Sequence, residues 1–310
     1  MARRSRATSR GKAHSFGGDW TSTKLDVLAK YLTAYTTALK DKPSAERPFR
    51  KAYIDAFAGT GYRTMRRERD EGPAYGKLLF PDLAEAAPQQ LLDGSARLAL
   101  KAQPHFDRYI FIERDADRCH ELEALKAEFP DLAASIHVEQ GEANEEIRQI
   151  CAKDWRAHRA VLFLDPYGMQ VEWQTIEAIA KTEAIDLWLL FPLGIGVNRL
   201  LTRSGEIPEG WRARLDMLLG TTSWYDEFYR VEHKATLFGN DEERIVKATN
   251  QTIGQYFNDR LKTIFPGVAE PGVLRNSANC PLYLLCFAAG NEKGAPIALK
   301  IANHLLKEVR

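Results

Sequence analysis

A short apolar segment that ends in two glycines is the part of this sequence best suited to hold a ligand. The residues from Tyr53 to Gly61 read Tyr-Ile-Asp-Ala-Phe-Ala-Gly-Thr-Gly. Gly59 and Gly61 permit a tight turn in which the backbone can approach a ligand where any Cβ would collide. Asp55 and Phe57 precede them, and Asp55 can orient the loop or meet a cationic group of the ligand. A plain strand-to-loop turn explains the glycines alone equally well.

An acidic residue ends the next predicted strand. Glu113 closes the segment 108–113, and a carboxylate there can accept hydrogen bonds from both hydroxyls of a ribose. A solvated acid at the end of a strand is the alternative. In dinucleotide-binding folds such an acid lies about twenty residues beyond the glycines, whereas here its separation from Gly61 is far larger. The spacing therefore disfavours a nicotinamide-dependent oxidoreductase.

Glu142, Ala143 and Asn144 follow the third predicted strand, 135–140. At this place an amide or a carboxylate can pair with the exocyclic amine of an adenine. Asn144 can equally serve as the N-cap of a helix over 144–158, because its side-chain oxygen can accept a backbone N–H. The two roles are compatible, and the sequence leaves both open.

The run Asp165-Pro166-Tyr167-Gly168 is the candidate catalytic element, and it follows the predicted strand 159–164. An enzyme that methylates an exocyclic amine must draw electron density onto the nitrogen and hold it in line with the methyl donor. The Asp165 carboxylate and the Pro166 carbonyl can accept the two N–H groups, while Tyr167 can stack on the base. The alternative is an Asp-Pro turn beside a core tyrosine.

Aromatic and basic residues outside these strand ends can add further contacts. Trp20 and Lys24 open the first predicted helix, where they can fold over a cofactor or its carboxylate, or form a helix start with an exposed lysine. Arg63, Arg66 and Arg67 follow the glycines and can bind phosphates of a substrate. Acidic residues interleave with these arginines, so a solvated loop is an equally valid interpretation.

Alternating strand and helix patterns must bring these groups to one edge of a sheet. Strands separated by helices of this length indicate parallel βαβ units and an α/β, Rossmann-like fold with a mainly parallel twisted sheet. We expect a mostly helical insertion over about 197–265, an antiparallel strand pair from 272–276 and 282–288, and Ser95 as the N-cap of a short helix. The other predicted strands are 49–57, 108–113, 135–140, 159–164 and 185–191, and the other helices are 21–39, 116–128, 144–158, 172–182 and 295–308.

Composition bounds the class of protein. The 310 residues carry a net charge of +1 and are 45% hydrophobic and 27% charged, as in an ordinary globular protein. We expect residues 1–18 to form a flexible basic arm and 19–310 one domain, with insertions at about 62–94 and 197–265. Four scattered cysteines predict neither a disulfide framework nor a metal site. No apolar run is long enough to span a membrane, so we expect a cytoplasmic protein.

The strand-end groups taken together resemble the S-adenosylmethionine site of a Rossmann-like methyltransferase. In addition, five motifs in order resemble the three-Cys-motif partner protein family (TcmP), over most of residues 18–308. They are Trp20-Thr-x-x-Lys24, Asp55-x-Phe57-x-Gly59-x-Gly61, Gly94-Ser95-Ala96, Asp165-Pro-Tyr-Gly168 and Leu282-Tyr-Leu-Leu-Cys-Phe287.

This resemblance implies a methyltransferase-type fold and a second protein of the three-Cys-motif type as partner, and it favours Trp20 and Lys24 near the cofactor. The catalytic element also resembles the Asp-Pro-Pro-Tyr signature of amino-group DNA and RNA methyltransferases. It departs from that signature, because Tyr167 replaces the second proline and Gly168 replaces the aromatic residue. The stacking ring is therefore displaced by one position.

Three functional hypotheses follow. The first is an S-adenosylmethionine-dependent methyltransferase that modifies an amino group of a nucleic acid. The second is a cofactor-binding but catalytically inactive subunit that docks on another enzyme. The third, a nicotinamide-dependent oxidoreductase, lacks a recognisable hydride-transfer constellation in the sequence.

Overall fold

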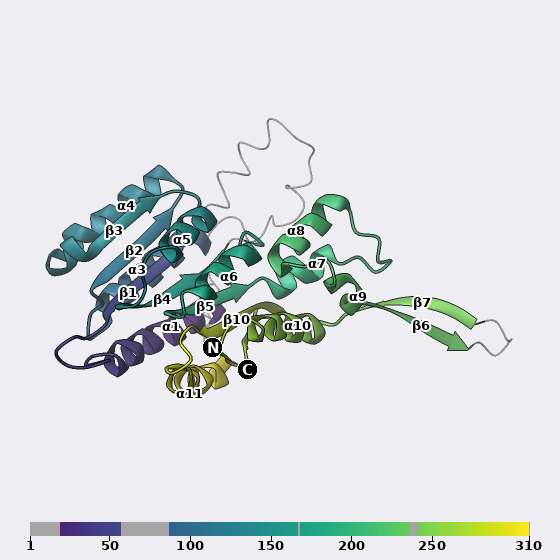
Figure 1. Ribbon diagram of the computed structural model, residues 1–310. Coiled ribbons are helices and arrows are strands. Elements are labelled where there is room, and N and C mark those ends of the chain that lie inside the picture. The colour runs from purple at the N-terminus through teal and green to yellow at the C-terminus, as the bar shows by residue number, and fades with distance from the viewer. Residues whose placement is uncertain (1–18, 57–86, 167, 236–240, 310) are drawn as a thin grey trace, which may run out of the picture.

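A computed structural model describes residues 19–56, 87–166, 168–235 and 241–309. Its centre is a sheet of eight strands in the order β3-β2-β1-β4-β5-β10-β8, with β9 paired to β10 (Figure 1). The strands are β1 (Arg50–Ala56), β2 (Arg108–Glu113), β3 (Ile136–Gln140), β4 (His158–Leu164), β5 (Ile185–Phe191), β8 (Gly267–Val268), β9 (Gly272–Arg275) and β10 (Pro281–Ala289).

The first five strands run parallel, while β10 runs antiparallel to β5, β8 and β9. The order 3-2-1-4-5 is that of a Rossmann-like, doubly wound sheet. The expected fold class is therefore confirmed, including the antiparallel pair at the C-terminal end.

The sheet is buried on both faces. Successive side chains along each strand point to opposite faces, so they pack into two separate cores. Ile54 and Leu162 pack into one core, and their neighbours Tyr53 and Val161 pack into the other. The first core is covered by α5 (Ala143–Cys151), α6 (Trp173–Lys181), α8 (Glu209–Leu219), α9 (Trp224–Phe228) and α10 (Asn250–Lys262). The second is covered by α1 (Asp19–Ala38), α3 (Ala87–Lys101), α4 (Ala116–Glu128) and α11 (Ala295–Leu306).

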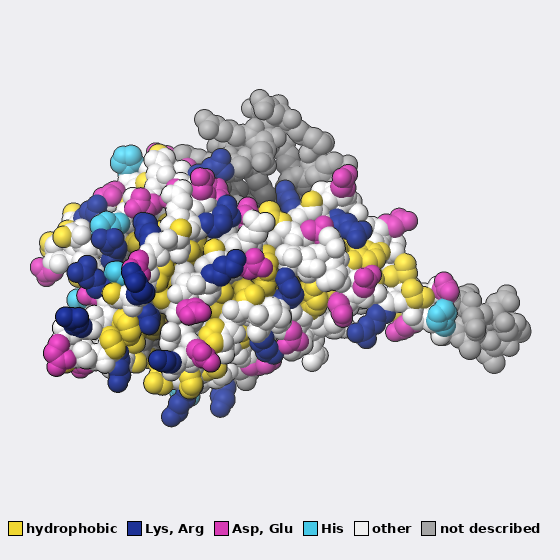
Figure 2. Space-filling model, in the orientation of Figure 1, with side chains coloured by type: hydrophobic (Ala, Val, Ile, Leu, Met, Phe, Trp, Pro, Cys, Tyr) yellow, Lys and Arg dark blue, Asp and Glu magenta, His cyan; other side chains and the backbone are white. Residues whose placement is uncertain are grey.

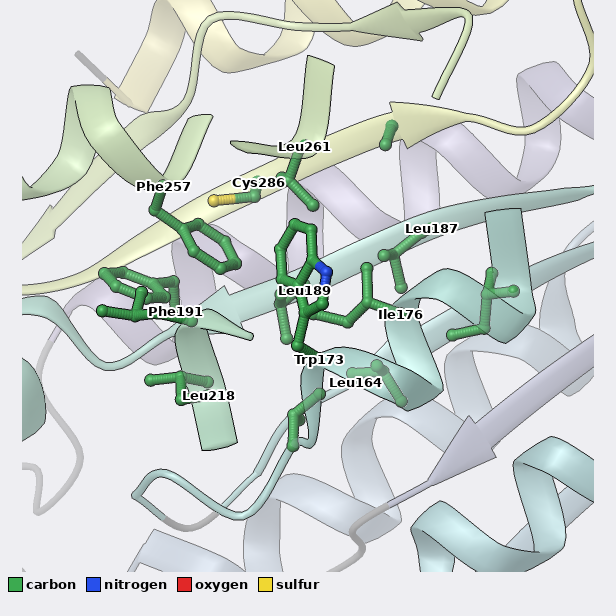
Figure 3. Close-up of a cluster of buried hydrophobic side chains, with 14 of the residues drawn as sticks. Leu164, Trp173, Ile176, Leu187, Leu189, Phe191, Leu218, Phe257, Leu261 and Cys286 are labelled. Atoms are coloured by element: carbon green, nitrogen blue, oxygen red, sulfur yellow. The ribbon is translucent and has the colours of Figure 1, made fainter. Parts of the chain in front are cut away.

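Trp173 shows how the first core joins distant segments. Its indole lies among Leu187 and Leu189 of β5, Phe257 of α10 and Cys286 of β10 (Figure 3). Its ring meets that of Phe257 edge to face, with the centroids 6.2 Å apart. This contact fixes α6 and α10 against the same strands, which holds the carboxyl ends of β4 and β5 in place.

Two sequence expectations are wrong in their local detail. Ser95 does not cap a helix, because α3 begins at Ala87 and places Ser95 in its interior, where it is buried. The segment 197–265 is not mostly helical, since it contains an antiparallel hairpin of β6 (Tyr229–Ala235) and β7 (Asp241–Lys247). The first four residues of β6, Tyr-Arg-Val-Glu, alternate between apolar and polar, which is the period of a strand rather than of a helix.

The expected helix over 144–158 is also too long, because α5 ends at Cys151. The other predicted strands and helices among the described residues agree with the structure to within about two residues at each end. Among the described helices, none combines the length and apolar character needed to cross a membrane. On the described part of the face in Figure 2, basic and acidic side chains are interspersed without a field of one sign.

A tight backbone approach locks β10 onto the segment after β5. A Cβ on Gly194, in the π-helical turn Leu193–Val197, would lie 1.9 Å from the carbonyl oxygen of Pro281. Because that oxygen belongs to the backbone of β10, a side chain at this position must displace one of the two segments.

We expect Gly194→Ala to lower the free energy of unfolding by about 1–3 kcal/mol, through overpacking. The measurement is chemical denaturation of the purified chain. Gly210→Ala in α8 is the matched control, because a Cβ there meets no heavy atom within 4 Å and alanine favours a helix. Equal stabilities for the two variants would contradict this account.

Candidate functional site

The candidate site lies where the strand order reverses, between β1 and β4. From β1 the chain builds outward through β2 and β3, and it then returns to place β4 on the other side. In open α/β sheets, ligands bind outside the carboxyl ends of the strands at such a point. Ala56 pairs with Leu164 in register, so Asp165 emerges directly beside the end of β1.

Lys24 reaches this edge from the first turns of α1. Its side chain is fully buried, and its ammonium forms an ion pair with the Asp165 carboxylate, which is 23% exposed. A buried ammonium requires such a partner, because its desolvation is otherwise very costly. The interpretation of Lys24 as an exposed lysine is therefore wrong, and α1 is tied directly to the end of β4.

Aromatic rings surround this lysine. The Lys24 Nζ lies 5.2 Å from the ring centroid of Trp20, within the range of a cation–π contact. The Trp20 ring in turn lies 5.1 Å from that of Tyr283 on β10. Trp20 and Lys24 thus lie together beside Asp165, while their contact with a cofactor stays a prediction.

Asp55 is the second carboxylate of the cluster, and it is only 3% exposed. It accepts a hydrogen bond from the Tyr53 hydroxyl at 2.9 Å. Burial raises the pKa of Asp55 to about 7; hydrogen bonds from Ser95 and Tyr53 oppose this shift, and the charges of Asp165 and Lys24 act in opposite directions. Asp55 therefore lies within the electrostatic influence of the Lys24–Asp165 pair, and it can take up or release a proton near neutral pH.

Glu113 lies at the same edge, at the end of β2, and it is 1% exposed. Its Oε1 accepts the backbone N–H of Asp115 at 2.8 Å. Its Oε2 lies 3.9 Å from the Arg118 guanidinium and has no hydrogen bond within the described residues. Burial raises the pKa of Glu113, while the Asp115 N–H and Arg118 lower it. One buried oxygen is thus free to accept a hydroxyl donor such as that of a ribose.

Glu142, rather than Asn144, caps α5. The helix begins at Ala143, and the Glu142 carboxylate accepts the backbone N–H of Glu145 at 2.9 Å. The N-cap role that the sequence left open for Asn144 is therefore wrong.

The Asn144 side chain instead ties α5 to the loop before α6. Its Nδ2 donates to the Gln170 carbonyl at 2.9 Å and to Glu142 at 3.0 Å. Its Oδ1 accepts from the Glu172 N–H and the Thr175 hydroxyl, each at 3.0 Å. These four bonds use the full capacity of an amide, so an adenine contact from Asn144 would have to replace one of them.

The remaining predicted residues divide into two groups. The first group comes from strand ends and from α1, which meet at the carboxyl edge of the sheet. Its members are Asp165, Pro166, Asp55, Glu113, Trp20 and Lys24. The second group lies outside the described residues, so the roles of its members remain predictions. It consists of Phe57, Gly59, Gly61, Arg63, Arg66, Arg67 and Tyr167.

Sequence reasoning missed two partners of Asp55. Tyr53 lies two positions earlier on the same face of β1, and this spacing is the signal that could have found it. Ser95 comes from α3, whose start was misplaced. No described group of His, Cys, Asp and Glu side chains has a metal-binding arrangement.

No protein-family model matches the chain, and a search of curated proteins found no significant match. Among solved structures, the chain is similar to the Legionella pneumophila protein LPL1258, assigned to the family model DUF519. The identity is 11%, 92% of each chain is covered and the TM-score is 0.39. It is also similar to the plantazolicin methyltransferase BamL, solved with a triazolic desmethylPZN analog and SAH, at 11% identity, 87% and 86% coverage and a TM-score of 0.31. At these scores neither similarity supports an argument about activity.

The raised pKa of Asp55 makes stability depend on pH. Between its ordinary value of 3.8 and about 7, the folded chain binds a proton that the unfolded chain has released. Folding stability therefore falls as pH rises through this window, by up to about 4 kcal/mol from this group. We expect Asp55→Asn to flatten the dependence measured by denaturation from pH 4 to 8. The control is Asp154→Asn, because Asp154 is exposed and its pKa is lowered rather than raised. This variant should keep the decline of folding stability with rising pH. Parallel curves for Asp55→Asn and the parent chain would refute the assignment.

Asn144→Ala should lower the free energy of unfolding by about 2–4 kcal/mol, because it removes the partners of the buried Thr175 hydroxyl and of the partly buried Gln170 carbonyl and Glu172 N–H. Thermal denaturation measures this effect, and Gln251→Ala at an exposed position of α10 is the control. A fully stable Asn144→Ala variant with a large loss of cofactor affinity would instead support the adenine contact.

Proposed function

We propose that this chain is an S-adenosylmethionine-dependent methyltransferase that acts on an amino group of a nucleic acid. The observation that carries the proposal is the meeting of Asp165, Lys24 and Asp55 at the switch point of the sheet. Glu113 supports it by offering a buried oxygen, at the next strand end, that has no hydrogen bond within the described residues.

The residues present fit the cofactor through their donor and acceptor chemistry. Glu113 Oε2 would accept from a ribose hydroxyl, and Asp55 and Trp20 stand at the edge where the remainder of the nucleoside would lie. When bound, S-adenosylmethionine supplies an electrophilic methyl group. The other tasks fall to the protein: it must exclude water, hold the amine and accept its N–H bonds.

Asp165 and Pro166 would hold the acceptor amine. The Asp165 carboxylate and the Pro166 carbonyl accept N–H groups, which raises the electron density on the nitrogen. Lys24 would keep the Asp165 carboxylate in place and compensate its charge before the amine arrives. Because Asp55 has a pKa of about 7, it can take up the proton that the amine loses, directly or through water.

The proposal includes a protein partner of the three-Cys-motif type, and its support is the ordered set of motifs in the sequence. The nucleic-acid substrate is supported by the likeness of Asp165-Pro166 to the signature of amino-group methyltransferases and by the arginines at 63, 66 and 67.

The test combines calorimetry with S-adenosylmethionine, at tens of micromolar protein, and transfer of its labelled methyl group to RNA and to DNA. We expect binding by the parent chain and by Asp165→Asn, with transfer slowed roughly 10²–10³-fold in that variant. Asp154→Asn, the same change at the exposed turn before β4, should retain full activity.

Each outcome separates the hypotheses. No heat of cofactor binding would reject the enzyme and its site together. Cofactor binding without transfer to RNA or DNA, in the presence and absence of a three-Cys-motif partner, would favour the docking subunit. Transfer that is unaffected by Asp165→Asn would remove Asp165 and Pro166 from the catalytic assignment.

A further inference from the structure

A large cavity opens at the opposite end of the sheet from the candidate site. Its volume is about 1120 Å³, and it is lined by the second half of α1, the end of α6, the turn after α10, the β10–α11 connection and α11. Arg159 and Asp186, each the second residue of its strand, mark its floor. Arg159 is six residues before Asp165 along β4, which is about 20 Å. The cavity is therefore separate from the site described above.

The carboxylate in the floor is already occupied by the protein. Asp186 is 8% exposed; one of its oxygens accepts the Tyr31 hydroxyl at 2.7 Å, and the other accepts the Gly290 N–H at 2.9 Å. These bonds join α1, β5 and the end of β10. Asp186 thus serves the fold, and it offers a ligand little that is unused.

The hydrogen-bond donors in the floor, Arg159 and Tyr35, are not fully paired with protein acceptors as Asp186 is with donors. Arg159 Nη1 donates to the backbone carbonyls of His158 and Trp155, at 2.6 and 3.3 Å, and within the described residues no carboxylate lies at ion-pair distance from Arg159. Its guanidinium carbon lies 3.9 Å from the Phe49 ring centroid. Tyr35 is 7% exposed, and its hydroxyl has no hydrogen bond within the described residues. Tyr35, Arg159 and Asp186 all line this cavity. Burial raises the pKa of Tyr35, the charge of Asp186 raises it further and that of Arg159 lowers it.

The walls are largely apolar. The cavity is lined by Leu39 just after α1, Ile264 after α10 and Ile301 of α11. Ile297, which also lines it, is 59% exposed. The rim carries three lysines and three glutamates, Lys42, Lys181, Lys293, Glu177, Glu183 and Glu292, so its charges balance and repel neither sign of ligand. A matching ligand therefore needs an apolar body and an acceptor for the donors of the floor.

We propose that this cavity binds a small amphipathic carboxylate, with its carboxylate on the Arg159 guanidinium and the Tyr35 hydroxyl and its apolar body against α1 and α11. A guanidinium that stacks on a ring and keeps unused N–H groups suits the planar, two-oxygen acceptor of a carboxylate. The volume is of the size that holds a complete small ligand.

The test uses octanoate as probe and the full chain, with calorimetry. We expect a dissociation constant below about 1 mM for octanoate, as suits a ligand of this size, and much weaker binding of octanol. Arg159→Met should weaken octanoate binding at least tenfold and Tyr35→Phe about three- to tenfold, because each removes a donor. Arg156→Met, the same change at an exposed arginine paired with Asp154, should leave it unchanged.

Three results would overturn the proposal: no octanoate binding by the parent chain, equal binding of octanol, or tighter binding of octylamine, which would assign the floor to Asp186 and a cation. Circular dichroism checks that the variants fold. Should Arg159→Met fail to fold, Tyr35→Phe and the comparison of octanoate with octanol decide the matter, because the Tyr35 ring can keep its stacking on Phe106 without the hydroxyl.

Discussion

The buried ion pair between Lys24 and Asp165 is the interaction on which the candidate site depends. It joins the first helix to the end of the fourth strand across 141 residues of sequence, and it places an ammonium whose charge acts on both Asp165 and Asp55. Burial and the charge of Asp165 raise the pKa of Asp55 while Lys24 lowers it, so loss of Lys24 would favour the protonated form of Asp55. The position of α1 against the sheet is therefore part of the chemistry of the site as well as part of its packing.

That position rests on the division of the sheet into two cores. Tyr31 and Leu32 of α1 are fully buried against the same face that carries Tyr53, so α1 cannot move without opening the second core. The first core is held independently by α6 and α10 through Trp173. The strand ends that carry Asp55, Glu113 and Asp165 are thus fixed from both sides, which suits groups that must keep their relative geometry.

The architecture was accessible from the sequence because the parallel strands are continuous apolar runs, such as Val161–Leu164, separated by amphipathic helices. Such patterns are local. The strand-end acids Asp55, Glu113 and Asp165 followed from the same reading, since parallel strands bring their carboxyl ends to one edge. The pairing of Lys24 with Asp165 did not follow, because no local pattern encodes a contact between residues so far apart. Asn144 illustrates the same limit: its partners Gln170 and Thr175 belong to a segment that only tertiary structure brings near.

The β6–β7 hairpin extends away from the body of the protein (Figure 1). The side-chain hydrogen bonds that anchor it lie at its base. Lys247 donates to the carbonyls of Asn198 and Leu201, and Tyr229 donates to that of Thr202. Further out, the cross-strand pair Val231 and Ile245 remains 56% and 43% exposed. A two-stranded ribbon has little independent stability, so the position of β6 and β7 depends on these contacts at the base. Because the ribbon is anchored at one end, a displacement of its apolar pair would act first on Lys247 and on the backbone carbonyls of Asn198 and Leu201 that hold it.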